Sequence, residues 1–119
     1  MEPCVFCQLI NKTIPAAILY EDELLIAIPD RNPIAPEHIL LIPKTHYDSL
    51  NEVPESEEVL ISHLLFTARK IAIDQGIGAS GYRLVVNTGK QGGQSVFHLH
   101  VHLLGGKPLG VDLITRGLQ

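Results

Sequence analysis

The sequence contains no tryptophan and only three Phe and three Tyr, so its core is expected to be mainly aliphatic. Its nine Lys and Arg residues form no basic run and the net charge is −4, which argues against nucleic acid as a partner. No stretch reaches the roughly 18 apolar residues that span a bilayer, so no membrane association is expected. The first ten residues, MEPCVFCQLI, lack a basic region, which argues against secretion and favours a cytoplasmic location.

The chain also lacks an internal repeat, a low-complexity tract and a linker. Its 119 residues, 45% of them hydrophobic, are about right for one compact domain with a core of its own. We therefore expect a single domain over residues 1–119. The two cysteines are too few for a disulfide framework, and their C-x-x-C spacing is more typical of metal binding or redox chemistry in a reducing compartment.

Short apolar runs bounded by turn residues predict five strands. They lie in residues 16–22, 24–30, 38–44, 82–87 and 96–104. The segment CVFCQLINKTIP predicts a short helix that ends before Pro15, with Val5, Leu9 and Ile10 facing inward. Because most strands follow one another in hairpin order, the expected fold is an α+β domain with an antiparallel sheet.

Residues 56–75 predict the one long helix. Acidic residues lie in its first turn, and Gly76 and Gly78 follow its end. Helical spacing predicts that six of its apolar side chains face the core: Val59, Leu60, Leu64, Ala68, Ile71 and Ala72.

The segment FHLHVHLLGG places His98, His100 and His102 at every second position. In a strand these three side chains share one face, and the intervening Leu, Val and Leu share the other. The histidines could simply fill a sheet face, or two or three of them could bind one metal ion. Alternatively, His100 could be a nucleophile, with one ring nitrogen held by a backbone carbonyl and the other aimed at an electrophile.

The preceding segment TGKQGGQS favours the nucleophile. Gly89, Gly92 and Gly93 would let backbone N–H groups approach an anion closely, and Gln94 and Ser95 add side-chain donors. A phosphate cradle beside an imidazole suggests attack at phosphorus.

The run from His98 to Leu104 resembles the H-φ-H-φ-H-φ-φ signature of the histidine triad nucleotide hydrolases and transferases. Further blocks that resemble this family in order are FCQLINKTIPA, AIPDRNPIAPEHILLIPKTH, GYRLVVNTG and GGQSVFHLHVHLLGG. They cover about residues 4–106, with residues 107–119 as a carboxy-terminal tail. The resemblance, strongest to the nucleotide-binding branch, implies a homodimer whose two five-stranded sheets join into ten strands. It also implies hydrolysis of purine nucleoside 5′-phosphoramidates, with an AMP-type nucleotide in the site.

The same resemblance assigns roles to individual residues. His100 would form a nucleotidyl-histidine intermediate that water then cleaves, and His102 and Ser95 would hold phosphate oxygens or the leaving group. The phosphate site would be lined by Asn87, Gly93 and Gln94, the ribose site by Asp30 and Arg31, and the purine wall by Leu9, Ile14 and Ile28. On the residues alone, Asp30 and Asn87 would be read as turn formers and the three apolar residues as core.

Cys4 and Cys7 need two further ligands to complete a tetrahedral metal site. Some bacterial triad proteins resemble this chain in joining such a pair to a His after the third strand and to the first triad His. This likeness implies structural zinc on Cys4, Cys7, His46 and His98, while a reduced, metal-free pair remains the alternative. Of the other histidines, His63 would pack near the apolar stripe of the long helix, and nothing supports a role for His38.

The tail KPLGVDLITRGLQ lacks the Trp-containing ending of animal relatives, which puts the preferred leaving group in doubt. Dinucleoside polyphosphate cleavage therefore stays open. Two other classes also remain: a non-catalytic AMP-binding regulator, and a zinc-dependent hydrolase with the triad as metal ligands. The physiological substrate and protein partners do not follow from the sequence.

Overall fold

The computed structural model describes residues 4–110. Two helices and five strands occur in these residues in the following order: α1 (Val5–Ile10), β1 (Tyr20–Glu21), β2 (Leu25–Pro29), β3 (Glu37–Pro43), α2 (Glu58–Asp74), β4 (Tyr82–Val85) and β5 (Val101–Gly105). Short 3₁₀ turns lie at Leu50–Glu52, Glu55–Glu57 and Lys90–Gly92. Within this range no helix combines the length and apolar character needed to cross a bilayer. Most of the carboxy-terminal tail, 111–119, lies outside the described residues.

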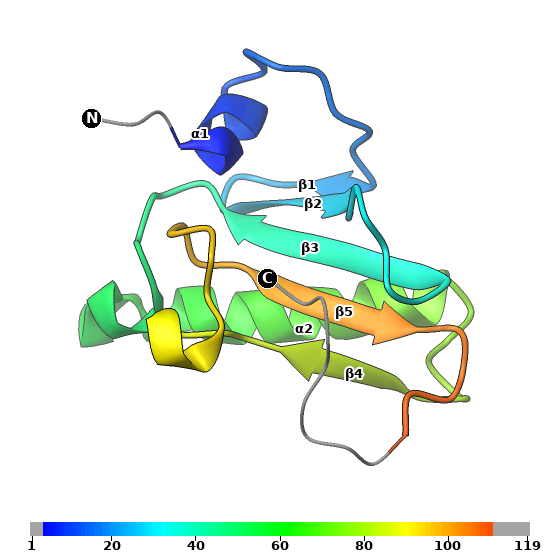
Figure 1. Ribbon diagram of the computed structural model, residues 1–119. Coiled ribbons are helices and arrows are strands. Elements are labelled where there is room, and N and C mark those ends of the chain that lie inside the picture. The colour runs from blue at the N-terminus through cyan, green and yellow to red at the C-terminus, as the bar shows by residue number, and fades with distance from the viewer. Residues whose placement is uncertain (1–3, 111–119) are drawn as a thin grey trace.

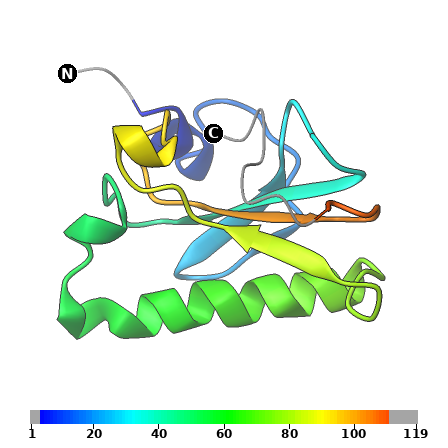
Figure 2. The ribbon, with the colours of Figure 1, turned by 60° about the horizontal axis from the view of Figure 1, so that its bottom comes forward.

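The five strands form one sheet in the order β1-β2-β3-β5-β4, and every neighbouring pair is antiparallel (Figure 1). Strand β5 thus lies between β3 and β4, and β4 forms one edge. Helix α2 covers one face of the sheet, while α1 and the turn at residues 90–92 lie over the other (Figure 2). The predicted α+β fold with one long and one short helix is confirmed.

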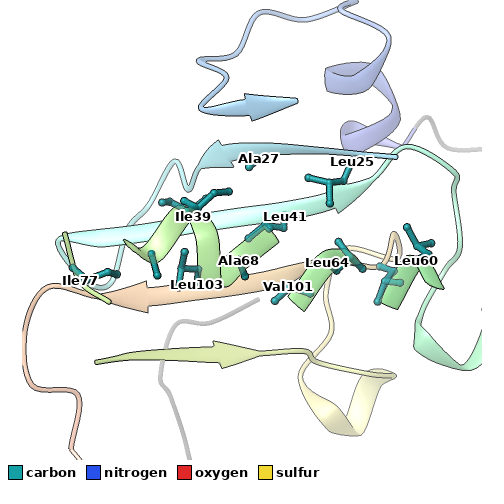
Figure 3. Packing of buried hydrophobic residues seen from close by; sticks show 13 residues of the cluster. Leu25, Ala27, Ile39, Leu41, Leu60, Leu64, Ala68, Ile77, Val101 and Leu103 are labelled. Atoms are coloured by element: carbon teal, nitrogen blue, oxygen red, sulfur yellow. The ribbon is translucent and has the colours of Figure 1, made fainter. Parts of the chain in front are cut away.

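The continuous apolar runs of β2 and β3 are explained by burial on both faces of the sheet. Alternate residues of each strand belong to two separate hydrophobic clusters. The larger cluster joins Leu25, Ala27, Ile39 and Leu41 to α2 and to Leu99, Val101 and Leu103 (Figure 3). The smaller one, on the side of α1, contains Phe6, Ile26, Ile28, Leu40 and Ile42.

Helix α2 begins at Glu58, two residues later than predicted, because Glu55–Glu57 form a 3₁₀ turn after Pro54. Five of the six side chains predicted to face the core are buried: Leu60, Leu64, Ala68, Ile71 and Ala72. Val59 was predicted wrongly and is 69% exposed. Its neighbour Leu60 starts the buried stripe, and a residue one position earlier is rotated by about 100° around the helix.

Helix α1 buries Phe6, whereas Val5, predicted to face inward, is 39% exposed. The ring of Phe6 packs edge-on against His100, with ring centroids 5.0 Å apart. Leu9 and Ile10 pack at the margin of the smaller cluster, as predicted. A helix of six residues has too few turns for periodicity to define its buried side, so the contact with the triad decides the orientation.

Strand β5 begins at Val101, five residues after the predicted start. The ladder with β3 ends at the pair Leu41 and Val101, before Pro43, which has no N–H to donate. Beyond it, the N–H of Leu99 donates to the carbonyl of Tyr47 at 2.7 Å. The segment still alternates between faces, since Leu99 joins the larger cluster on the α2 side.

Candidate active site and metal centre

Four histidines lie on the face of the sheet that carries α1. His98, His100 and His102 come from β5 and the segment before it, and His38 comes from β3. The strand register pairs Leu40 with His102, which places His38 and His102 as diagonal neighbours on one face. All four are at most 4% exposed. At such depth each ring nitrogen must be matched to a donor or an acceptor.

The nucleophile candidate His100 has its tautomer set by the backbone. Its Nδ1 lies 2.7 Å from the carbonyl oxygen of His98. A carbonyl can only accept, so Nδ1 carries the proton and the lone pair of a neutral ring is on Nε2. The ring of His102 lies beside it, with centroids 4.9 Å apart. This is the arrangement that a nucleophilic imidazole requires.

A second chain of hydrogen bonds sets the tautomer of His102. The backbone N–H of Ile34 donates to Nδ1 of His38 at 3.1 Å, so the proton of neutral His38 is on Nε2. That Nε2 lies 3.0 Å from Nδ1 of His102, which must then accept. His102 consequently carries its proton on Nε2. Burial lowers the pKa of His38 despite the opposing charge of Asp30, which favours the neutral ring.

His38 is a member of this histidine cluster for which the sequence supported no role. A signal was present, because His38 has the same parity in its strand as Leu40 and Ile42 and therefore points to the same face. A buried histidine on that face has to find polar partners, and Nε2 of His38 has His102 at 3.0 Å and Asp30 at 3.3 Å.

Asp30, expected at the ribose, lies next to His38. Its Oδ1 accepts the backbone N–H of Asn32 at 2.7 Å, as in a turn-forming aspartate. Its Oδ2 lies 3.3 Å from Nε2 of His38. The residue thus serves both as a turn former and as part of the histidine cluster. Arg31, expected beside it, is exposed.

The glycine-rich loop has a hydrogen-bond pattern that differs from the expected phosphate cradle. The N–H of Gly92 donates to the carbonyl of Gly89, that of Gly93 donates to Lys90, and that of Gly89 donates to Oε1 of Gln94. All three of these N–H groups are used inside the loop. The side chain of Gln94 is buried and also engaged, since its Nε2 donates to the carbonyls of Asp48 and Val96.

Other residues expected around the phosphate are placed near the same loop. Gly93 has a φ of +88°, a conformation that favours glycine, and a Cβ there would lie 3.9 Å from Cγ of Asn87. Ser95 follows the buried Gln94 and is exposed. Asn87, half-buried, therefore meets the loop at Gly93.

The three residues expected at the purine wall differ in their surroundings. Ile28 is buried in the smaller cluster and Leu9 packs against its margin. Ile14 is half-buried and is not among the described residues packed against that cluster. Among the described residues, Phe6 packs directly on His98 and His100, and Ile28 and Leu9 extend the same apolar cluster.

The thiols of Cys4 and Cys7 lie close to the rings of two histidines beside α1. Sγ of Cys4 lies 3.3 Å from Nδ1 of His98, and Sγ of Cys7 lies 3.3 Å from Nδ1 of His46 and 3.6 Å from Nδ1 of His98. All four ligand atoms lie within 4.8 Å of one another. These residues form a group that could hold a metal ion, and they are the four expected from the sequence.

Both histidines of this group present a lone pair to the sulfurs. Nε2 of His98 donates to the carbonyl of Pro43 at 2.8 Å, and Nε2 of His46 donates to Oδ1 of Asp48 at 2.8 Å, so Nδ1 is unprotonated in each neutral ring. Burial lowers the pKa of His98 to about 4. Burial also raises the pKa of the Cys7 thiol, with a further contribution from Cys4.

Asp30, His38 and His102 form a second group whose ligand atoms lie close together. Its hydrogen bonds do not suit a metal ion. Because Nδ1 of His38 accepts the N–H of Ile34, Nε2 holds the proton and has no lone pair for a metal. The two groups are therefore chemically different: one presents lone pairs, and the other forms a chain of N–H donors.

The chain is similar in sequence and structure to several known proteins. The family model described as the HIT domain matches residues 11–109. Purine nucleoside phosphoramidase of Escherichia coli is 44% identical over 117 residues, covering 98% of both chains. A HIT family hydrolase from Clostridium thermocellum has a TM-score of 0.91 and 47% identity, with 96% of this chain and 99% of that chain covered. A zinc-bound histidine triad family protein from Mycobacterium smegmatis has a TM-score of 0.77 and 33% identity, with 93% and 79% covered.

Proposed function

The chain belongs to the HIT domain family, and from this premise we propose that it hydrolyses purine nucleoside 5′-phosphoramidates through a covalent nucleotidyl-His100 intermediate. The observation that carries the proposal is the bond between Nδ1 of His100 and the carbonyl of His98, because it leaves the lone pair on Nε2. Similarity over nearly the full length to a purine nucleoside phosphoramidase supports the substrate class.

In the first step, Nε2 of His100 forms a bond to phosphorus while the bond from phosphorus to the leaving nitrogen breaks. The carbonyl of His98 stabilises the positive charge that develops on the ring through the Nδ1–H bond. In the second step, water attacks phosphorus and the bond to His100 breaks, which releases the nucleoside monophosphate and restores the neutral ring.

His102 presents its Nε2–H group as a donor in this reaction. This group would donate a hydrogen bond to a phosphate oxygen, while the leaving nitrogen takes up a proton from solvent as its bond to phosphorus breaks and the water of the second step returns one. The donor state is maintained by the hydrogen bond from His38. Ser95 and Asn87 would hold the phosphate, and Gly93, whose N–H is bonded to the carbonyl of Lys90, would leave room beside Asn87. Asp30 and Arg31 would hold the ribose, and Leu9, Ile14 and Ile28 the base. Gln94 would act through its buried contacts.

His100→Asn tests the nucleophile directly. The variant should lose nearly all hydrolysis of adenosine 5′-phosphoramidate while keeping the fold and the binding of AMP, because only the attacking nitrogen is removed. Circular dichroism and calorimetric titration with AMP provide the controls. Retention of more than about a tenth of the wild-type rate would contradict nucleophilic catalysis.

A screen of adenosine 5′-phosphoramidate, lysyl-adenylate and diadenosine tetraphosphate would rank the leaving groups. We expect the two compounds that present a P–N bond or an adenylate to be cleaved faster than the dinucleotide. Preference for diadenosine tetraphosphate would place the enzyme among the dinucleoside polyphosphate hydrolases. Binding of AMP without any turnover would instead indicate a nucleotide-binding regulator.

We propose that the metal held by Cys4, Cys7, His46 and His98 is zinc. A tetrahedral zinc ion about 2.3 Å from sulfur and about 2.0 Å from nitrogen separates these ligand atoms by about 3.5 Å, close to the 3.3 and 3.6 Å found here. Four protein ligands leave no position for a catalytic water, so zinc would stabilise the fold. It would join α1 to the segment that carries His98.

A homodimer in the cytoplasm completes the proposal. Strand β4 lies at the edge of the sheet, where a second copy could extend it. A second surface with exposed apolar side chains is the outer face of α2, where Val59, Phe66 and Ile73 lie at seven-residue intervals and are 69, 59 and 60% exposed. Sedimentation equilibrium should give the mass of two chains.

The closely spaced thiols of Cys4 and Cys7 support the cytoplasm as the location, because it is a reducing compartment in which thiols stay available to bind zinc.

A further inference from the structure

Gln94, at the end of the glycine-rich loop, joins the start of that loop to the segment after β3 that follows His46. It is 4% exposed. Nε2 of its side chain donates to the backbone carbonyl of Asp48 at 2.6 Å and to that of Val96 at 3.1 Å, while Oε1 accepts the N–H of Gly89 at 2.8 Å. One amide thus fixes the distance between the segment after β3 and the start of the loop.

On the metal side, the connection continues from Asp48 to His46. Nε2 of His46 donates to Oδ1 of Asp48 at 2.8 Å, and Nδ1 of the same ring faces Sγ of Cys7 at 3.3 Å. A metal ion on Nδ1 would fix the orientation of this ring. Asp48 would then be held by a fixed donor, as carboxylates behind metal-bound histidines are.

On the nucleotide side, Gly89 sets the shape of the loop. Its φ is +74°, and its carbonyl accepts the N–H groups of both Gly92 and Gln94. The side chain of Gln94 returns to the N–H of the same Gly89. A displacement of Gln94 would therefore move Gly89 and the turn that precedes Ser95.

We propose that Gln94 is a positioning residue that couples metal occupancy to nucleotide affinity. The inference rests on the proposed function, since it takes AMP as the ligand near the loop and zinc as the metal. Zinc on His46 holds Asp48, Asp48 holds the amide of Gln94, and the amide holds the turn that precedes Ser95, which contacts phosphate in the proposed function. The nucleophile His100 is held separately, by the carbonyl of His98. Loss of the contacts of Gln94 should therefore weaken AMP binding without displacing His100.

Calorimetric titration of zinc-loaded and metal-free protein with AMP tests the coupling. Circular dichroism should first confirm that the metal-free protein is folded at the temperature used. Zinc should tighten AMP binding about fivefold, near the lower end of typical coupling between two sites. By linkage, saturating AMP should tighten zinc binding by the same factor, measured by competition with a chromophoric chelator.

The Gln94→Met variant keeps the length of the side chain and removes all three hydrogen bonds. Its AMP affinity should become nearly independent of zinc, while its zinc affinity without AMP stays at the wild-type value. Gln91→Met is the matched control, because Gln91 is exposed in the same loop. This control should keep the fivefold effect.

Gln94→Glu provides a second variant if Gln94→Met does not fold. It keeps an acceptor for Gly89 and loses the donor to Asp48, so zinc dependence should again disappear whatever the new charge does to the affinity itself. Retention of the fivefold effect in a folded Gln94 variant would overturn the proposal, as would its absence from wild-type protein that binds both ligands. If AMP does not bind zinc-loaded wild-type protein, the proposed function fails and the coupling fails with it.

Discussion

Replacing His38 by asparagine should slow turnover while leaving His100 in place. The shorter amide can still accept the N–H of Ile34, because its oxygen reaches about as far as Nδ1 of histidine. It cannot reach Nδ1 of His102, which His38 contacts at 3.0 Å. His102 then loses the donor that keeps its proton on Nε2.

The size of the effect follows from the burial of this pair. His38 and His102 are 4% and 1% exposed, so the lost bond leaves a buried acceptor whose desolvation costs about 1–3 kcal/mol. If about 2 kcal/mol of this is felt in the transition state, kcat falls about thirtyfold. His38→Gln should lose far less, because the longer amide places its nitrogen near the position of Nε2 and can donate to His102.

Steady-state hydrolysis of adenosine 5′-phosphoramidate by the two variants provides the assay, with AMP affinity as a control for the site. The asparagine variant should fall well below the glutamine variant in kcat, and both should bind AMP. Equal kcat values for the two variants, or an asparagine variant as fast as wild type, would refute the role given to His38.

Three further predictions concern the neighbouring groups. His102→Ala should reduce kcat less than His100→Asn does, because it removes a donor and leaves the nucleophile; an equal or larger loss in parallel rate measurements would mean that the two roles are reversed. The double variant Cys4→Ser, Cys7→Ser should have a lower melting temperature in calorimetry but should still hydrolyse the phosphoramidate without added divalent ions. If metal-free protein is fully folded but inert, and activity returns in proportion to added zinc, the zinc-hydrolase alternative is favoured. In urea unfolding of the metal-free protein, the free energy of unfolding should fall by up to about 3 kcal/mol between about pH 6.5 and about pH 4. The reason is that His98 takes up a proton near pH 6.5 in the unfolded chain, whereas burial lowers its pKa to about 4 in the folded protein. A flat profile over this range would contradict the burial of a neutral ring.

The periodicities of the sequence predicted the five strands and, apart from Val59, the buried face of α2, but the first strand covers only Tyr20–Glu21 of the predicted 16–22. Alternation in the triad segment placed Leu99, Val101 and Leu103 on the α2 side although the regular strand starts only at Val101. The strand boundary could not be predicted, because it depends on Pro43 in a strand far away in the sequence. The orientation of α1 depends likewise on the contact between Phe6 and the triad.

The site was predictable where chemistry is carried by residue type and spacing. The spacing of the two cysteines indicated a metal site, but His46 and His98 could be named as its other ligands only through the resemblance to the family. The structure brings these four residues together. Alternation in β3 indicated the face of His38, but its partner His102 depends on the register between β3 and β5, which local patterns do not encode. Gln94 was expected to contact phosphate, whereas its buried amide serves the loop.

The covalent intermediate on His100 is the central claim, and trapping it is the most direct test. Enzyme mixed with radiolabelled adenosine 5′-phosphoramidate would be quenched in alkaline denaturant within one turnover, digested and analysed by mass spectrometry. The account predicts an adenylyl group on His100, formed and lost at rates that match turnover. Label on another residue, or turnover with no labelled protein at any time, would contradict it.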